Sequence, residues 1–187
     1  MRATLLMILG LSVLWAGVAR AAPPAPRPYS GLGILTLRGP SGAGAASLAV
    51  YAEPGLQRIA EPASAALPRL AGDPGEPRLA VSANRGRWVR IAYDDAGREG
   101  WIEPPRSAEY LTWQEFLPGR TVRVLPGMKK VLYAVRGEAQ EAGPETGSLA
   151  RDQQVRVLQV EGEWARLQAP AGWFRWRDAD GRLTVSP

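Results

Sequence analysis

Short runs of alternating polar and apolar residues recur along the chain, and Gly, Pro and Asp separate them. In residues 88–91 and 164–167 the second and fourth positions are aliphatic, whereas the first and third are tryptophan and arginine. A period of two is typical of a β-strand that buries one face. After residue 22 the best helical candidate is residues 60–70, and Pro62 and Pro68 interrupt it. The pattern therefore predicts an all-β protein.

Four sequence features occur twice in the same order, which predicts two similar β modules. Each copy has a strand-like tyrosine segment, an apolar-x-Val run, a Gly-x-Trp strand and a Gly-Trp-apolar step. They lie at 48–51, 79–81, 86–91 and 100–102 in the first copy and at 131–133, 155–157, 162–167 and 172–174 in the second. An extra apolar strand is expected before each copy, at 34–37 and 121–125. We expect the modules to cover residues 32–106 and 107–187.

The segment between the repeated features carries aromatic residues of its own. Thr112 and Glu115 have the spacing of a capping box, which predicts a short helical turn. Packing between the modules is one interpretation of the aromatic residues, and an exposed surface for a partner is the other. The residues concerned are Tyr110, Trp113, Phe116 and Trp176.

Residues 1–21 have the features of a cleavable signal peptide. Arg2 precedes an apolar run that begins at Leu5, and residues 19–21 place alanine at the two positions that signal peptidase reads. The alternative is an uncleaved membrane anchor, although the run is shorter than the ~20 residues of a spanning helix. Residues 22–31 are rich in proline and predict an extended tether. We therefore expect an exported protein that is periplasmic or extracellular, and that meets the membrane only if this segment is uncleaved.

Composition excludes several kinds of chemistry. The 187 residues include no Cys and no His, which excludes a Ser-His-Asp triad, a Cys-His pair, a disulfide and a thiolate zinc site. The net charge of +5 forms no basic run, unlike the clustered charge of nucleic-acid-binding proteins. Residues 178–181 predict an Asp-Gly turn, because they lack the full ligand set of a calcium loop. We expect no cofactor, no metal and no nucleic-acid partner.

The repeated features resemble the bacterial SH3-like (SH3b) domain, present twice. The second copy also has Gly147-Ser148-Leu149, whereas the first departs from the family pattern in the Pro-rich residues 53–77. The resemblance covers roughly residues 46–103 and 129–176. It implies two small, partly open β-barrels in tandem. It also implies a place beside cell-wall enzymes or alone in the envelope, binding peptidoglycan peptides or protein partners.

The alternation places a tryptophan and an arginine on the outer face of one strand in each module. These pairs are Trp88 with Arg90 and Trp164 with Arg166. Such a pair can bind an acidic, partly apolar ligand by stacking and by bidentate hydrogen bonds. The alternative is structural, with each tryptophan covering a barrel mouth and its arginine stacked beside it. The binding interpretation requires Trp88 and Trp164 to be exposed.

Carboxylates are the remaining candidates for catalysis. Asp94, Asp95 and Glu99 share an expected hairpin loop, while Glu161 and Glu163 flank a glycine. A glycosidase needs two carboxyl groups about 5–10 Å apart in a cleft, which small barrels seldom enclose. Solvated turns are the simpler interpretation, and we assign no catalytic residue.

We therefore expect an exported, non-catalytic binding or scaffolding protein of the bacterial cell envelope. Its ligand would be a peptidoglycan peptide or a protein partner. One alternative is a purely structural accessory subunit of an envelope complex. The other, which the small-barrel architecture disfavours, is a carboxylate-based cell-wall hydrolase.

Overall fold

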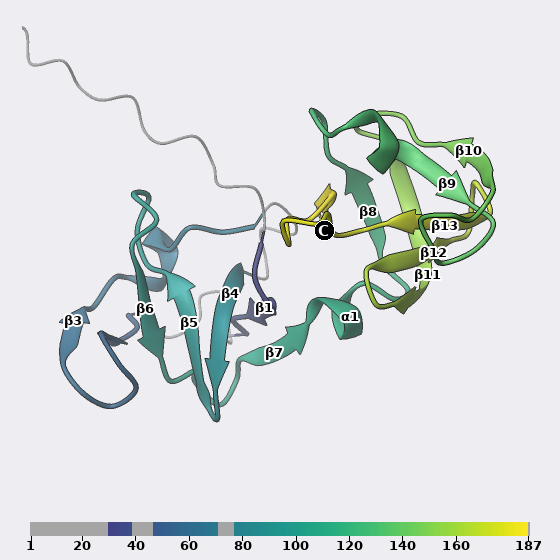
Figure 1. Cartoon of the computed structure of the whole chain (residues 1–187). Coiled ribbons are helices and arrows are strands. Elements are labelled where there is room, and N and C mark those ends of the chain that lie inside the picture. The colour runs from purple at the N-terminus through teal and green to yellow at the C-terminus, as the bar shows by residue number, and fades with distance from the viewer. Residues whose placement is uncertain (1–29, 39–46, 71–76, 187) are drawn as a thin grey trace, which may run out of the picture.

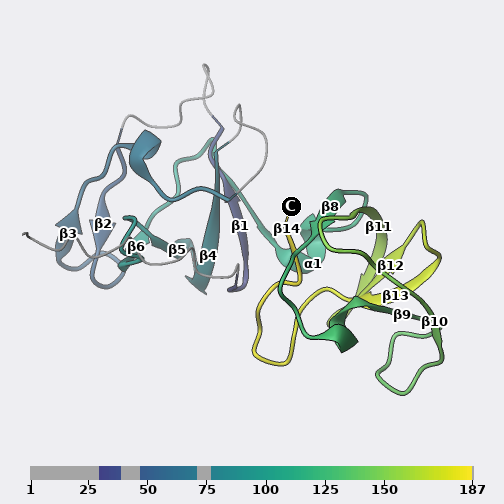
Figure 2. The same cartoon turned by 90° about the horizontal axis from the view of Figure 1, so that it is seen from above.

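The computed structural model describes residues 30–38, 47–70 and 77–186, and these are mostly β-structure. Their strands form two antiparallel seven-stranded sheets, which confirms the all-β prediction. The two sheets lie side by side, and the chain passes between them through the short helix α1 (Trp113–Phe116) (Figures 1 and 2). The predicted signal peptide and residues 22–29 of the predicted tether lie outside the described residues.

The first sheet has the strand order β3-β2-β6-β5-β4-β1-β7. Its strands are β1 (Gly33–Thr36), β2 (Val50–Tyr51), β3 (Arg58–Ala60), β4 (Arg78–Arg85), β5 (Trp88–Ala92), β6 (Glu99–Ile102) and β7 (Glu109–Thr112). A 3-10 helix, η1 (Ser64–Ala66), is the helical part of the segment that two prolines interrupt. Because β7 pairs with β1, this sheet continues past residue 106, where we placed the end of the first module.

The second sheet has the order β10-β9-β13-β12-β11-β8-β14. Its strands are β8 (Thr121–Val124), β9 (Ala134–Arg136), β10 (Glu145–Ser148), β11 (Gln154–Glu161), β12 (Trp164–Leu167), β13 (Gly172–Arg175) and β14 (Val185–Ser186). The strand expected over residues 131–133 is wrong, because this segment belongs to the 3-10 helix η2 (Lys130–Tyr133). The Tyr133 hydroxyl donates to the Leu125 carbonyl and accepts from the Met128 N–H, which ties this turn to the preceding loop.

The two orders match strand for strand, so the sequence repeat corresponds to a repeat of topology. Each sheet has one eight-residue strand, β4 in the first and β11 in the second. The first part of β4 pairs with β1 and the rest with β5, and the first part of β11 pairs with β8 and the rest with β12. A bulge interrupts the second pairing at equivalent places, after Val81 and after Val157. A bulge bends its strand, so each sheet can curve around its own core. The end strands of each order do not pair with one another among the described residues.

Strand β1 contributes to both hydrophobic cores because all four of its residues are buried. Leu35 points into the core of the first sheet, whereas its neighbour Ile34 joins the core that contains α1 and the second sheet. Leu70 joins the second core in the same way. The Trp113 N–H donates to the Leu32 carbonyl at 3.2 Å, which adds a backbone bond between α1 and the segment that enters β1. The two sheets therefore share a packed junction.

Candidate functional site

The first Trp-Arg pair lies on the outer face of β5. Val89 and Ile91 are 2% and 0% exposed and belong to the core. Trp88, by contrast, is partly exposed and Arg90 is exposed. Strand β12 has the same pattern, with Ala165 and Leu167 buried, Trp164 partly exposed and Arg166 exposed. The outward orientation that binding requires is thus present in both sheets.

Other parts of the first sheet partly cover its pair. The ring of Trp88 meets Tyr51 edge to face, with centroids 5.3 Å apart. A Cβ built on Gly55 would lie 3.8 Å from the Trp88 indole, so the β2–β3 turn passes over this ring. Arg90 forms an ion pair with Glu99 at 3.4 Å. Both members therefore already have partners within the protein.

Strand register places a second tryptophan beside each of these pairs. In the first sheet Tyr51, Trp101, Arg90 and Ala83 are directly opposite one another across β2, β6, β5 and β4, and we call this set the first row. Trp101 is only 7% exposed. The Arg85 guanidinium lies 5.2 Å from its ring centroid, and an ion pair with Glu53 at 3.1 Å holds that guanidinium. The tryptophan of the first row is thus covered by the neighbouring side chain of Arg85.

The equivalent set in the second sheet is Arg136, Trp173, Arg166 and Gln159, across β9, β13, β12 and β11, and we call it the second row. Trp173 is partly exposed, and no arginine of the described residues lies over its ring. The position equivalent to Arg85 is occupied by Glu161, which lies opposite Trp164. A carboxylate there cannot make the cation–π contact that covers Trp101.

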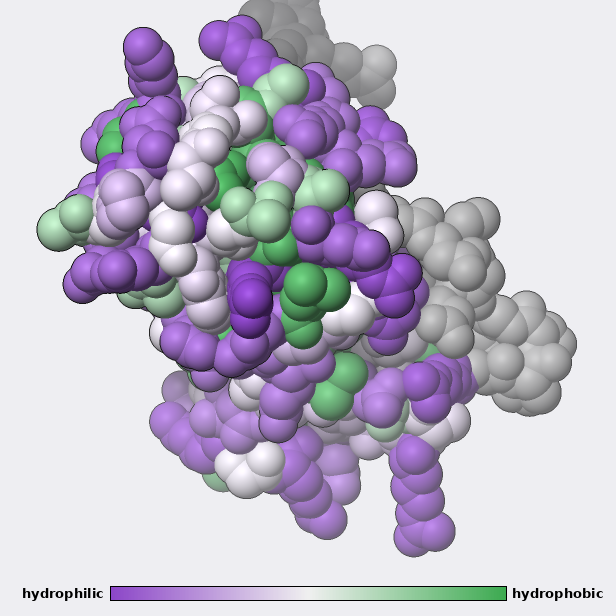
Figure 3. Space-filling model, turned by 90° about the vertical axis from the view of Figure 1, so that its right-hand side faces the viewer, coloured by the Kyte–Doolittle hydropathy of each residue, from purple (hydrophilic) through white to green (hydrophobic). Residues whose placement is uncertain are grey.

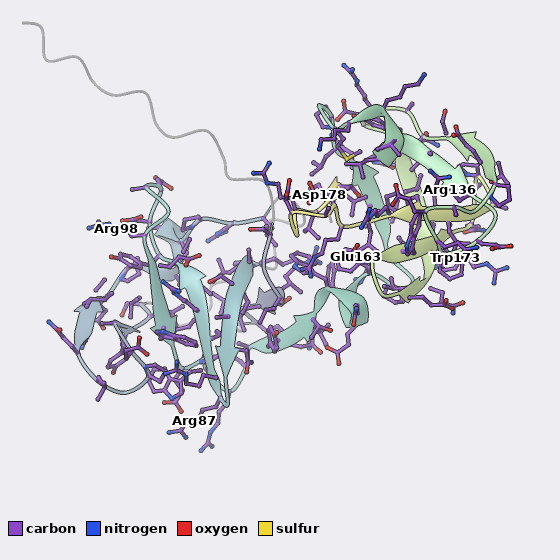
Figure 4. All side chains as sticks on the ribbon, viewed as in Figure 1. Arg87, Arg98, Arg136, Glu163, Trp173 and Asp178 are labelled. Atoms are coloured by element: carbon purple, nitrogen blue, oxygen red, sulfur yellow. The ribbon has the colours of Figure 1, made fainter. Side chains whose placement is uncertain are left out.

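Gly172 fixes the backbone that presents Trp173. Its φ is +147°, and a Cβ at this position would lie 2.5 Å from Val135 Cγ1 and 2.8 Å from the Arg136 carbonyl oxygen. Strands β13 and β9 therefore approach closely only because residue 172 has no side chain. This approach brings Arg136 beside Trp173. The Arg136 guanidinium also donates to the Gly143 carbonyl at 2.8 Å, which orients it. Figure 4 labels both residues on the second sheet.

The aromatic residues of the junction are mostly interior. Trp113, Phe116 and Trp176 are 1%, 4% and 2% exposed and belong to one core cluster, whereas Tyr110 of β7 is partly exposed. The capping box of α1 is present, with both the Thr112 and the Glu115 side chains accepting backbone N–H groups. Burial raises the pKa of Tyr110 above its ordinary value, and the Glu115 charge adds to this shift. Three of these four side chains therefore pack inside the protein rather than forming a surface.

The candidate catalytic carboxylates form turns or bind nearby side chains. Asp94 accepts the Arg98 backbone N–H at 2.9 Å, and this bond holds the pKa of Asp94 below its ordinary value, the opposite of what a general acid needs. Glu161 accepts from the Gln159 amide at 2.6 Å, while Glu163 pairs with Arg175 at 2.5 Å.

The predicted Asp-Gly turn is also present. The Asp178 carboxylate accepts backbone N–H groups from Asp180 and Arg182, and Gly181 has a φ of +77°. The described residues contain no group of three or more carboxylates arranged to hold a metal ion.

The sequence-based candidates omit Trp173 and Arg136. Trp173 lies in the repeated Gly-Trp-apolar step and was not paired with an arginine by the alternation, and Arg136 lies outside every repeated feature. Only the pairing of β13 with both β12 and β9 brings these two residues together with Arg166.

No protein-family model, curated protein or solved structure matches this chain. None of the described helices is long and apolar enough to cross a membrane.

Proposed function

We propose that this chain is an exported, non-catalytic binding protein of the bacterial cell envelope, built from two SH3-like units. It would recognise a peptide, from peptidoglycan or from a protein partner, on the outer faces of its sheets. Two features support the SH3-like assignment. The two sheets have the same strand order, and each has a long strand with a bulge, β4 or β11, that pairs with a strand on either side. Export and a periplasmic location rest on residues 1–21 of the sequence.

One observation carries the binding proposal. In the second sheet the partly exposed Trp173 lies directly opposite the exposed Arg166, whereas the equivalent Trp101, opposite Arg90 in the first sheet, is only 7% exposed. Opposite residues of an antiparallel pair have Cβ atoms about 5 Å apart, so one ligand group can touch both. An aromatic ring with a neighbouring guanidinium suits a ligand that is partly apolar and carries a carboxylate.

Co-sedimentation with purified peptidoglycan tests the first ligand class. Trp88→Ala and Trp164→Ala are expected to reduce retention while circular dichroism shows that the β-fold is kept. Since Trp88 packs on Tyr51, Arg90→Gln and Arg166→Gln serve as variants that leave the packing intact. Retention that none of these four changes removes would contradict binding at these faces.

A structural accessory subunit is the second candidate function, and the shared junction favours it. Trp113, Phe116 and residues of both sheets form one buried cluster, which fixes the two units against each other. In that case substitutions at the junction would abolish assembly of the envelope complex, and substitutions at the Trp-Arg pairs would not.

A further inference from the structure

The two sheets differ in how their arginines are neutralised. In the first unit the arginines that form ion pairs with carboxylates include Arg38, Arg58, Arg85, Arg87, Arg90 and Arg98. In the second sheet, Arg175 alone does so among the described residues. This difference leaves positive charge available on the outer face of the second sheet.

Several carboxylates of the second unit bind groups other than Arg136 and Arg166. Glu141 and Glu163 both bind Arg175, and Glu161 binds the Gln159 amide. Glu145 of β10 lies opposite Arg136 in register, but no ion pair within 4 Å joins them. Among the residues that the structure describes, no carboxylate forms an ion pair with either guanidinium group of the second row.

These two guanidinium groups flank the ring of the second row. Arg136 and Arg166 lie on the strands to either side of β13, which carries Trp173. Strands are about 4.8 Å apart, so the two arginine backbones lie about 10 Å from each other. Leu158, the extra residue at the bulge that precedes Gln159, is 48% exposed. Its counterpart in the first sheet is the polar Ser82. Figure 3 shows a largely hydrophilic surface on this side of the molecule, with small hydrophobic areas among the polar residues.

From this arrangement we infer that the second row binds an extended acidic segment of a partner protein, and that the first row does not. This inference rests on the proposed binding function and specifies its ligand. Alternate side chains of an extended chain point to the same side, so two carboxylates four positions apart share one face, about 13 Å from each other, with an apolar residue midway between them. The long arginine side chains allow these carboxylates to reach Arg136 and Arg166 together, while the apolar side chain meets Trp173. Charge-assisted bonds to guanidinium provide the orientation, and the indole provides the apolar contact.

The first row lacks these features although its topology is the same. Glu99 neutralises Arg90, and Tyr51 stands where Arg136 stands in the second row. Arg85 covers Trp101. A carboxylate arriving there would have to displace an existing ion pair.

A synthetic peptide tests the inference. The probe is acetyl-Gly-Glu-Ala-Leu-Ala-Glu-Gly-amide, and its control replaces both Glu residues by Gln. Binding to the purified full-length protein is measured by isothermal titration calorimetry at low salt. We expect the acidic peptide to bind and its control to bind at least tenfold more weakly. Arg136→Gln and Arg166→Gln should each weaken binding about fivefold, the effect of one exposed ion pair.

Two matched variants carry the same change of charge away from the second row. Arg87→Gln lies in the turn between β4 and β5 of the first sheet, and Arg123→Gln lies on β8, at the other side of the second sheet. Both should leave the affinity for the peptide unchanged. Equal weakening by these two variants and by Arg136→Gln and Arg166→Gln would show a general charge effect and overturn the site. A further variant, Arg90→Gln, tests the first row directly. Weakening by Arg90→Gln without weakening by Arg136→Gln or Arg166→Gln would move the site to the first sheet and overturn the inference, while leaving the proposed function in place.

Peptidoglycan separates failure of the inference from failure of the function. Binding to soluble peptidoglycan fragments without binding to the acidic peptide would overturn the protein-segment inference and keep the binding function. Absence of binding to both would overturn both. If the second row is the site, the wild-type protein binds the peptide, and only Arg136→Gln and Arg166→Gln weaken this binding.

Discussion

Replacing Phe116 by alanine tests the junction between the two sheets. Phe116 is 4% exposed, and its ring meets Trp113 edge to face at 6.0 Å. The guanidinium groups of Arg78 and Arg120 lie 5.6 and 5.0 Å from its ring centroid. Removing a buried phenylalanine costs about 3–5 kcal/mol, and loss of two cation–π contacts moves the result toward the upper part of that range. This is a large share of the about 5–15 kcal/mol that stabilises a typical domain.

Urea denaturation followed by circular dichroism measures the loss. Phe116→Ala should lower the free energy of unfolding by about 4–5 kcal/mol, whereas Gln114→Ala, an exposed change on the same helix, should lower it by less than about 1 kcal/mol. Because the buried cluster includes Ile34 of the first sheet and Val155 of the second, the wild-type protein should unfold in one transition. A loss below about 1 kcal/mol for Phe116→Ala would refute the shared core.

The remaining predictions concern the cap, the sheet and the first row. Glu115→Gln should destabilise the protein at neutral pH, because the capping box lowers the pKa of Glu115 below its ordinary 4.5. The difference from wild type in urea denaturation should be complete above pH 4.5 and vanish as acid protonates the folded-state carboxylate. Gly172→Ala should cost about 2 kcal/mol or more in thermal denaturation, because its Cβ would collide with β9, whereas Gly147→Ala, with open space around it, should not. Glu53→Gln combined with Glu99→Gln should free two arginines of the first sheet but leave the acidic peptide at one site per protein in calorimetry, because Tyr51 stands where the second row has Arg136 and Trp101 is only 7% exposed. A second site for the peptide would contradict the importance assigned to Arg136 and to an open tryptophan ring.

Local patterns in the sequence predicted the features that depend on neighbouring residues. The period of two at residues 88–91 and 164–167 identified two strands and their buried faces, because burial of one face imposes that period. The Thr112 and Glu115 spacing identified the start of α1, since a capping box forms within one turn.

Features that depend on pairing between distant segments were not accessible in this way. The apolar residues at 131–133 suit a strand, but hydrogen bonds of the Tyr133 hydroxyl hold a 3-10 turn instead. The second row exists because β13 lies between β9 and β12, and no local pattern of Arg136 indicates that neighbour. The ion pair between Arg85 and Glu53 in the first sheet likewise joins residues far apart in sequence.

The indole N–H resonances in a nitrogen-15 NMR spectrum provide the most direct test of binding at the second row. Trp→Phe variants assign the resonances, and the acidic peptide is then added to the wild-type protein. We expect the Trp173 resonance to move with peptide concentration, since this ring lies between Arg136 and Arg166, while the Trp101 and Trp88 resonances stay in place. Movement at Trp101 or Trp88, or a Trp173 resonance that does not move at saturating peptide, would contradict the account.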